Sequence, residues 1–202
     1  MKIVSDFSDF YDKELEASSI YGIYRRMNGE NMNRKEALDY LREKGIRVID
    51  CDYARNIRLW RCTDVVVYLD SHKHGETNKE IVSKETAMQY YPNNIVTPYI
   101  PRKVRGECTL QYIRIGKHHW NLIFMGDKDT LSMGNLYSVE FLGTTGVRED
   151  TPIWSIDYIK NEEGAWVAVD YNDNPNIEHM TCRLKPDEVV KEMKWYCGSQ
   201  EE

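Results

Sequence analysis

The sequence predicts a single α+β domain, in which an N-terminal helical portion packs on a mainly antiparallel β-sheet and a C-terminal amphipathic helix closes the fold. The chain has 202 residues, of which 41% are hydrophobic and 30% charged, and this is ordinary globular composition. No internal repeat, low-complexity tract or linker interrupts it, which favours one domain. The apolar pattern divides residues 1–202 into a helix-rich part (1–100), a sheet-rich part (101–184) and a closing helix (186–197).

The best-defined element of the first half is a helix over residues 34–44. The segment Asn31-Met32-Asn33 supplies an N-cap, three apolar residues form one stripe (Ala37, Leu38 and Leu41), and Gly45 takes the position after the helix end. Other apolar spacings predict further elements of this half: a helix over 6–26, a half-buried strand at 46–50, a buried strand at 64–70, and a short helix at 83–91 that Ser83 caps and Pro92 ends.

From Cys108 onward the pattern favours strands. The segment Asn161–Gly164 separates two apolar runs and predicts a hairpin loop. Pro186 opens a segment whose apolar residues share one helical face, so a helix should close the chain. The expected strands are 110–115, 120–126, 136–143, 152–159, 165–171 and a short one at 180–184.

Charge and cysteine content restrict the class of protein. The net charge is −6, which argues against non-specific nucleic-acid binding through phosphate neutralisation. The five cysteines form no CxxC pair, so reduced thiols in a cytoplasmic protein are expected. No apolar run approaches the ~20 residues that span a bilayer, and the acidic N-terminus lacks a secretory signal pattern, so no membrane association is expected.

A basic cluster with interleaved aromatic residues is the first candidate site. Arginine at helical spacing can bind phosphate through two hydrogen bonds, and a neighbouring aromatic ring can stack on a base. These residues are therefore predicted to bind a small nucleotide-like ligand or a host protein. The alternative is a solvated helix face whose arginines pair with carboxylates. The predicted ligand-binding residues are Arg55, Arg58, Trp60, Arg61, Arg102, Lys103 and Arg105.

Histidines supply two further candidates. Asp70, His72 and His74 follow an apolar strand and could bind Zn or Mn, with His118 or His119 as a further ligand. The favoured interpretation is a solvated turn without a metal. His118 and His119 could also act as general acid and base, but adjacent side chains on a strand point to opposite faces, so at most one joins a given pocket. A hairpin tip is the favoured interpretation there.

Two segments carry a resemblance to a known group of proteins. The opening MKIVSDFSDFYD, together with PIWSIDYI, NPNI and LKPDEVVKEMKWYC near the C-terminus, resembles uncharacterised proteins of large-genome bacteriophages and some bacteria. The resemblance covers about the first dozen and the last fifty residues, and the central region departs from it. It implies a phage accessory protein in the host-cell cytoplasm and assigns no catalytic residue.

No complete catalytic motif is present: the sequence contains no GxSxG, no GxxxxGK[ST] and no GxGxxG. These observations favour a protein that is not an enzyme and has no cofactor. It would act as a counter-defence factor that binds a host protein or sequesters a nucleotide-like ligand, and it could form a homo-oligomer. The alternative is a metal-dependent or histidine-based phosphoester hydrolase, and a structural or assembly component is a third possibility.

Overall fold

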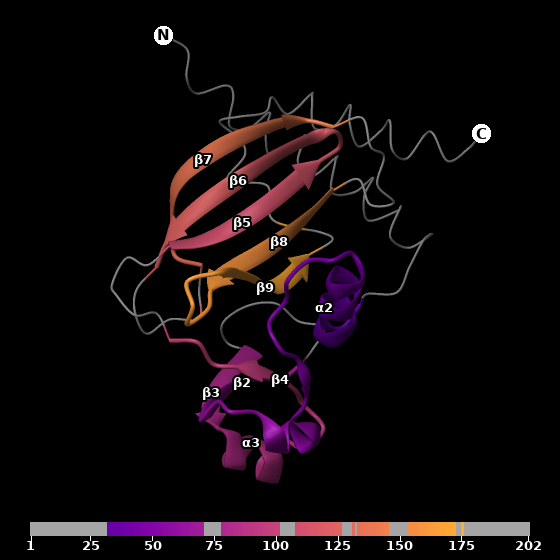
Figure 1. Cartoon of the computed structure of the whole chain (residues 1–202), viewed down its shortest axis with the longest axis vertical. Coiled ribbons are helices and arrows are strands. Elements are labelled where there is room, and N and C mark those ends of the chain that lie inside the picture. Colours follow the sequence, from indigo (N-terminus) through magenta and orange to yellow (C-terminus); the bar gives the residue numbers. More distant parts are fainter. Residues whose placement is uncertain are drawn as a thin grey trace, which may run out of the picture.

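The computed structural model describes residues 32–70, 78–101, 108–126, 131, 133–145, 153–172 and 175. These residues form helices and two antiparallel sheets, so the α+β class is confirmed (Figure 1). The sheet expected as one unit is divided in two, because the first hundred residues contribute strands that pair among themselves. The helix expected over 6–26, the strand at 180–184 and the closing helix at 186–197 lie outside the described residues.

The smaller sheet has four strands in the order β1-β4-β2-β3. Its central strand β2 is buried on both faces, which explains its continuous apolar run: Val65 and Val67 contact one hydrophobic cluster, whereas Val66 and Tyr68 contact another. A 3-10 helix, η1, and helix α3 cover the first of these faces. The bounds are β1 Asp52–Tyr53, η1 Ala54–Leu59, β2 Asp64–Tyr68, β3 Lys79–Ser83, α3 Lys84–Tyr90 and β4 Ile95–Pro98.

The larger sheet has five strands in the order β7-β6-β5-β8-β9. The expected hairpin over Asn161–Gly164 is confirmed: the Asn161 carbonyl accepts a hydrogen bond from the Gly164 N–H, at 2.9 Å. Gly164 has φ +79°, a conformation that favours glycine. The bounds are β5 Cys108–Ile115, β6 His118–Met125, β7 Asn135–Thr144, β8 Ile153–Lys160 and β9 Trp166–Asn172.

Helix α2 (Arg34–Glu43) lies beside β9 and above the smaller sheet (Figure 1). The predicted cap is confirmed, since the Asn33 side chain accepts the Glu36 N–H while the Glu36 carboxylate accepts the Asn33 N–H. The apolar stripe of the helix is buried in a hydrophobic cluster that also takes residues from β2, β4, β8 and β9. One core therefore joins the helix and both sheets.

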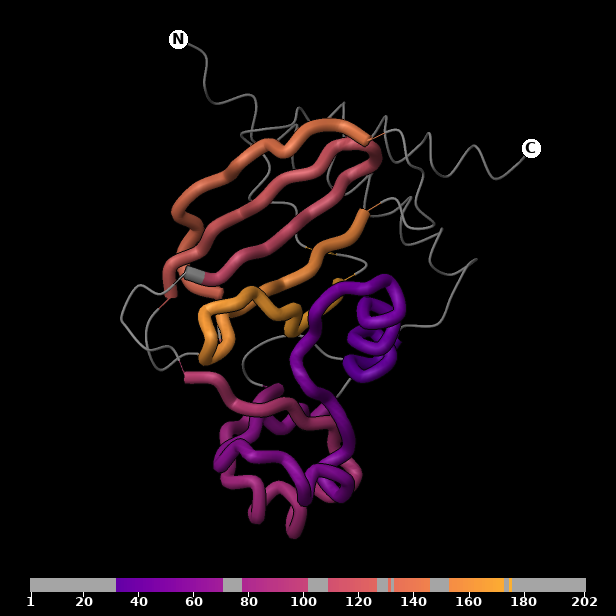
Figure 2. Tube along the Cα trace, in the orientation of Figure 1, coloured from indigo at the N-terminus to yellow at the C-terminus, as the bar shows by residue number. Residues whose placement is uncertain are grey.

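The segment after α2 runs along β9 to the smaller sheet, as the tube in Figure 2 shows. Residues 46–50 were expected to form a strand, but only Val48 forms a β-bridge, parallel to Ala168. The Ile49 N–H donates to the Ala168 carbonyl and the Ala168 N–H donates to the Arg47 carbonyl, both at 2.9 Å. No helix among the described residues is long and apolar enough to cross a membrane.

Candidate functional site

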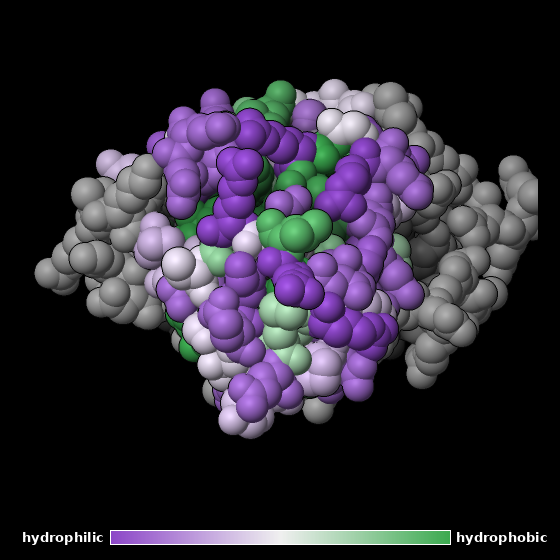
Figure 3. Space-filling view, turned by 60° about the horizontal axis from the view of Figure 1, so that its bottom comes forward, coloured by the Kyte–Doolittle hydropathy of each residue, from purple (hydrophilic) through white to green (hydrophobic). Residues whose placement is uncertain are grey.

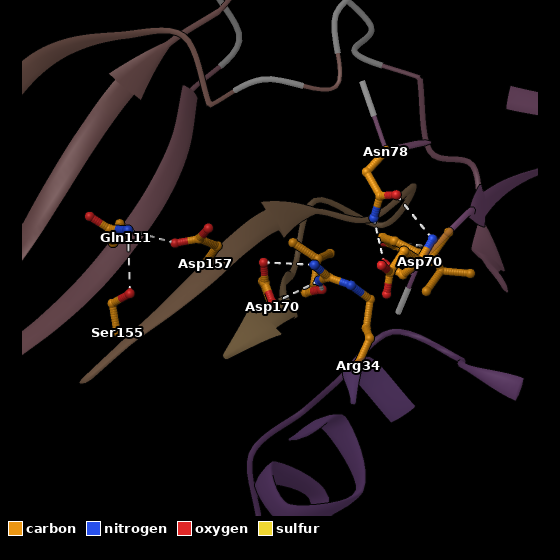
Figure 4. Close-up of polar contacts among 10 residues, drawn as sticks. Arg34, Asp70, Asn78, Gln111, Ser155, Asp157 and Asp170 are labelled. Carbon is orange, nitrogen blue, oxygen red and sulfur yellow. Dashed lines mark hydrogen bonds and ion pairs between the residues drawn. The ribbon is translucent and has the colours of Figure 1, made fainter. Parts of the chain in front are cut away.

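Two aspartates lie opposite each other on neighbouring strands, Asp157 on β8 and Asp170 on β9 (Figure 4). A β-bulge creates this pairing. Tyr158 pairs with Ala168, whereas Asp157 pairs with Asp170, so Val169 is an extra residue in β9. In a regular ladder Asp157 would face Val169, and the Asp170 side chain would point to the other side of the sheet. The bulge therefore brings the two carboxylates to one face, and we call Asp157 and Asp170 the carboxylate pair.

The Asp157 carboxylate is held by a polar side chain from β5. Gln111 Nε2 donates to Asp157 Oδ1 at 2.9 Å and also lies 3.4 Å from Ser155 Oγ (Figure 4). Burial and the charge of Asp170 raise the pKa of Asp157 to about 6, although the Gln111 hydrogen bond and the charge of Arg34 act in the opposite direction. Asp157 is thus ionised at neutral pH in surroundings that disfavour its negative charge, which a bound cation would offset.

The Asp170 carboxylate is paired with a buried arginine at the first residue of α2. Arg34 Nη1 lies 2.8 Å from Asp170 Oδ1, and Arg34 Nη2 donates to Asp170 Oδ2 at 2.9 Å. Arg34 Nη1 also donates to the carbonyl oxygen of the bulged residue Val169 at 2.8 Å. Burial by itself lowers the pKa of Arg34, but the Asp170 charge and hydrogen bond raise it, and the net shift is upward.

Arg34 also contacts the smaller sheet. Its guanidinium carbon lies 4.3 Å from the ring centroid of Tyr68 on β2, and the residue is only 5% exposed. The side chain therefore joins α2, β2 and β9 at one point. The Asp170 carboxylate and the Tyr68 ring are therefore the partners that allow this charged residue to be buried.

Asn172 adds an amide to the same face of the larger sheet. It pairs with Ser155, two residues from Asp157 on β8, and alternate residues of a strand share a face. Within the described ranges no three His, Cys, Asp or Glu side chains gather into a set that could hold a metal ion. Mg²⁺, however, is usually bound by one or two carboxylates together with substrate phosphates and water. The carboxylate pair with Asn172 fits that pattern, because it offers oxygen ligands and leaves the rest to a phosphate-bearing molecule.

The structure describes four of the seven residues of the predicted basic cluster. Arg55, Arg58 and Arg61 are exposed at the end of the molecule formed by η1 and α3, where Figure 3 shows hydrophilic residues around smaller hydrophobic areas. Arg55 stacks on Tyr53 at 4.8 Å and bonds the Asn93 side chain. Trp60 is half-buried against the hydrophobic cluster beneath η1 and α3, so it contributes to packing as well as being a candidate ligand-binding residue. Arg102, Lys103 and Arg105 lie outside the described residues, and a ligand role for the cluster stays a prediction.

The structure does not bring the described residues of the predicted metal site together. Asp70 follows β2, and its backbone N–H donates to Asn78 Oδ1 at 3.0 Å, whereas His72 and His74 lie outside the described residues. His118 and His119 begin β6 in the other sheet. They do face opposite sides, as expected.

His119 Nδ1 lies 2.9 Å from the Tyr112 hydroxyl, while the ring of His118 lies 5.9 Å from that of Trp120. Each histidine thus has an aromatic neighbour of its own on a different face of the sheet.

Sequence reasoning missed Arg34, Asp157, Asp170 and Asn172. One signal was present: each strand of the predicted 152–171 hairpin carries a single aspartate within an apolar run. The expected hairpin alone could not align these carboxylates, because the alignment depends on the bulge at Val169. Arg34 gave no signal, since an arginine at the start of a helix is usually solvated.

Comparisons with known proteins identify the fold. No family model and no curated protein matches the chain. Among solved structures, the chain is similar to D-cycloserine synthetase DcsG, with a TM-score of 0.52 and 10% identity over 84% of this chain and 70% of that one. It is also similar to the ATP-grasp ligase PsnB complexed with minimal precursor, with a TM-score of 0.51 and 8% identity over 80% of this chain and 61% of that one.

A second PsnB structure is complexed with a phosphomimetic variant of minimal precursor, Mg and ADP; its TM-score is 0.50 at 9% identity, and the chain covers 58% of its length. The chain thus spans about three fifths of PsnB.

These findings correct the functional expectation. A non-catalytic binding protein, and a phosphoester hydrolase as its alternative, are both contradicted, because the chain shares its fold with a D-cycloserine synthetase and an ATP-grasp ligase. The expectation of a non-enzymatic protein is wrong for the same reason. Nothing supports a counter-defence role, and the resemblance to phage proteins stays a prediction. The chain shares the fold of an ATP-grasp ligase.

Proposed function

We propose that this chain is an ATP-dependent ligase, or the nucleotide-binding part of one, and that it binds ATP with Mg²⁺ at the carboxylate pair. The observation that carries the proposal is the alignment of Asp157 and Asp170 by the β-bulge, in a fold shared with ligases. Bulges are frequent next to active sites because they redirect a side chain. Under this proposal the small nucleotide-like ligand predicted from the sequence is ATP, and its binding site is the carboxylate pair rather than the basic cluster.

The charge of the site supports a cation bound together with phosphates. Two carboxylates on one face repel each other, and burial adds to the cost of ionising Asp157. A divalent cation removes both penalties. Because the described residues offer too few ligands for a metal held by protein alone, phosphate oxygens of a nucleotide are the natural complement. PsnB, whose fold the chain shares, has been solved with Mg and ADP.

Each residue of the site then has a role. Asp157 and Asp170 would hold the cation, with Asn172 as a third oxygen ligand. Gln111 fixes the orientation of Asp157 through its 2.9 Å hydrogen bond. When bound, the cation neutralises phosphate charge and orients the phosphates for transfer.

A ligase uses the cleavage of ATP to join two other substrates. The solved structures with this fold include a D-cycloserine synthetase and a ligase complexed with minimal precursor. We propose amino acids and peptides as the substrate classes to be tested first.

Calorimetric titration with ATP tests the proposal directly. ATP should bind in the presence of Mg²⁺ and lose affinity by about 10-fold or more when EDTA removes the metal or when Asp157→Asn removes one carboxylate. Asp39→Asn is the matched control, because Asp39 is an aspartate of α2 paired with Lys35 and Arg42 away from the site. ATP binding that is indifferent to both EDTA and Asp157→Asn would refute the metal site.

Turnover is tested separately. ADP release should be stimulated by members of a panel of amino acids and peptides, and the product should contain a new covalent bond detectable by mass spectrometry. ATP hydrolysis without any joined product, across the whole panel, would count against a ligase.

A further inference from the structure

Arg34 contacts both oxygens of the Asp170 carboxylate, which the proposed function assigns to a metal ion. Its two terminal nitrogens reach both oxygens of that carboxylate, at 2.8 and 2.9 Å, in the two-point geometry that suits a guanidinium. A guanidinium cannot lose its proton in a protein, so Arg34 stays a cation at every accessible pH. The Asp170 carboxylate that would bind the metal therefore already has a cationic partner from within the chain.

The surroundings hold Arg34 firmly in this place. The Val169 carbonyl accepts a hydrogen bond from Nη1, and the guanidinium lies over the Tyr68 ring. Because the residue is 5% exposed, its charge is poorly screened by water, and it repels any second cation nearby. A free divalent ion would have to share or displace an ion pair that burial makes costly to break.

Building on the proposed function, we propose that Arg34 is a positioning residue that competes with free metal for Asp170, so that the metal binds together with the nucleotide rather than alone. The phosphates of ATP supply negative charge to both the metal and the guanidinium, which relieves the competition. Without nucleotide, a metal ion would have Asp157 and Asn172 as ligands, and it would reach Asp170 only in competition with Arg34. The ion pair between Arg34 of α2 and Asp170 of β9 would therefore prevent the metal from binding before the nucleotide.

A purely structural role makes the opposite prediction. If Arg34 only tied α2 to β9, its loss would loosen the carboxylate pair and weaken metal binding. If it competes with the metal, its loss removes a competing cation from Asp170 and strengthens metal binding. The direction of the change in metal affinity without nucleotide therefore separates the two roles.

The experiment measures Mn²⁺ binding by electron paramagnetic resonance, with and without ATP. Without ATP, Arg34→Gln should bind Mn²⁺ about 10-fold more tightly than the wild type, because a nearby positive charge is removed. Arg34→Lys should bind it more tightly by a smaller factor, because an ammonium is a point charge without the two-point fork. With ATP present, the difference between variants and wild type should shrink. Arg47→Gln is the matched control, because Arg47 forms an exposed ion pair with Glu163 in the same sheet region, and it should leave Mn²⁺ binding unchanged.

The outcomes separate the two proposals. If the wild type binds Mn²⁺ with ATP but neither Arg34 variant binds it more tightly without ATP, the competition is refuted and the metal site stands. If the wild type and both variants bind no Mn²⁺ even with ATP, the metal site fails and the competition fails with it. Should Arg34→Gln not fold, Arg34→Lys alone decides: equal or weaker Mn²⁺ binding than the wild type overturns the inference.

Discussion

Replacing Asp157 by asparagine should make the folded protein more stable at neutral pH. The pKa of Asp157 is raised from 3.8 to about 6 in the folded chain, by burial first and by the charge of Asp170 second. Between about pH 4 and pH 6 the folded state therefore keeps a proton that the unfolded chain has released. The free energy of unfolding of the wild type should fall as pH rises through this window, by the linkage between protonation and folding.

The magnitude follows from the size of the shift. A difference of about two pH units corresponds to roughly 3 kcal/mol. Asparagine resembles the protonated side chain, and its amide oxygen can still accept the hydrogen bond from Gln111. We therefore expect Asp157→Asn to add about 1–3 kcal/mol to the free energy of unfolding at pH 7.5, and almost nothing at pH 4.

Urea unfolding, followed by the fluorescence of the five tryptophans, measures this at several pH values. Asp39→Asn is a control of opposite sign. Burial raises the pKa of Asp39, but the hydrogen bond and charge of Lys35, with the charge of Arg42, lower it overall. That variant should lose at most ~1 kcal/mol near neutral pH, and less as the pH falls, since exposed pairs contribute little. If Asp157→Asn is no more stable than the wild type at pH 7.5, or keeps the same dependence between pH 4 and 6, the assigned electrostatics of the carboxylate pair are wrong.

Three further substitutions test the core, the ion pair and the helix cap in urea. Leu38→Ala removes a fully buried side chain of α2 and should cost about 2–5 kcal/mol, whereas Leu59→Ala, at a residue 91% exposed, should change stability by ~0.5 kcal/mol or less; similar losses would contradict the assigned burial. Arg34→Met should cost about 3–5 kcal/mol by removing the cationic partner of the Asp170 carboxylate, and adding Asp170→Asn should recover part of that loss; a double variant no more stable than the single one speaks against the ion pair. Asn33→Ala should cost about 0.5–2 kcal/mol through loss of the capping box, and no change would show that the cap is dispensable.

Structural elements that depend on residues close together in the sequence could be predicted from the sequence. The cap at Asn33, the cap at Ser83 and the hairpin over Asn161–Gly164 are confirmed, because each is built by hydrogen bonds within a few residues. The segment 46–50 shows the limit. Its alternating pattern fits a strand, but it finds a single bridging partner, Ala168, and so makes no regular ladder.

The division into two sheets could not be predicted in this way. The apolar run of β2 would suit the central strand of any sheet. Its partners in the structure are β3 and β4, and no local sequence pattern specifies which strands will pair.

By itself the sequence determined the α+β class, the helix α2 with its cap, and most strands of the larger sheet, because periodicity and capping are local properties. Only the tertiary structure decided that Asp157 and Asp170 form a pair, since the bulge at Val169 turns Asp170 to the face of Asp157. Only the tertiary structure brought Arg34 to Asp170 across 136 positions of the chain. A buried charge is stable only beside its partner, and which residues become neighbours is settled by packing rather than by any pattern along the chain.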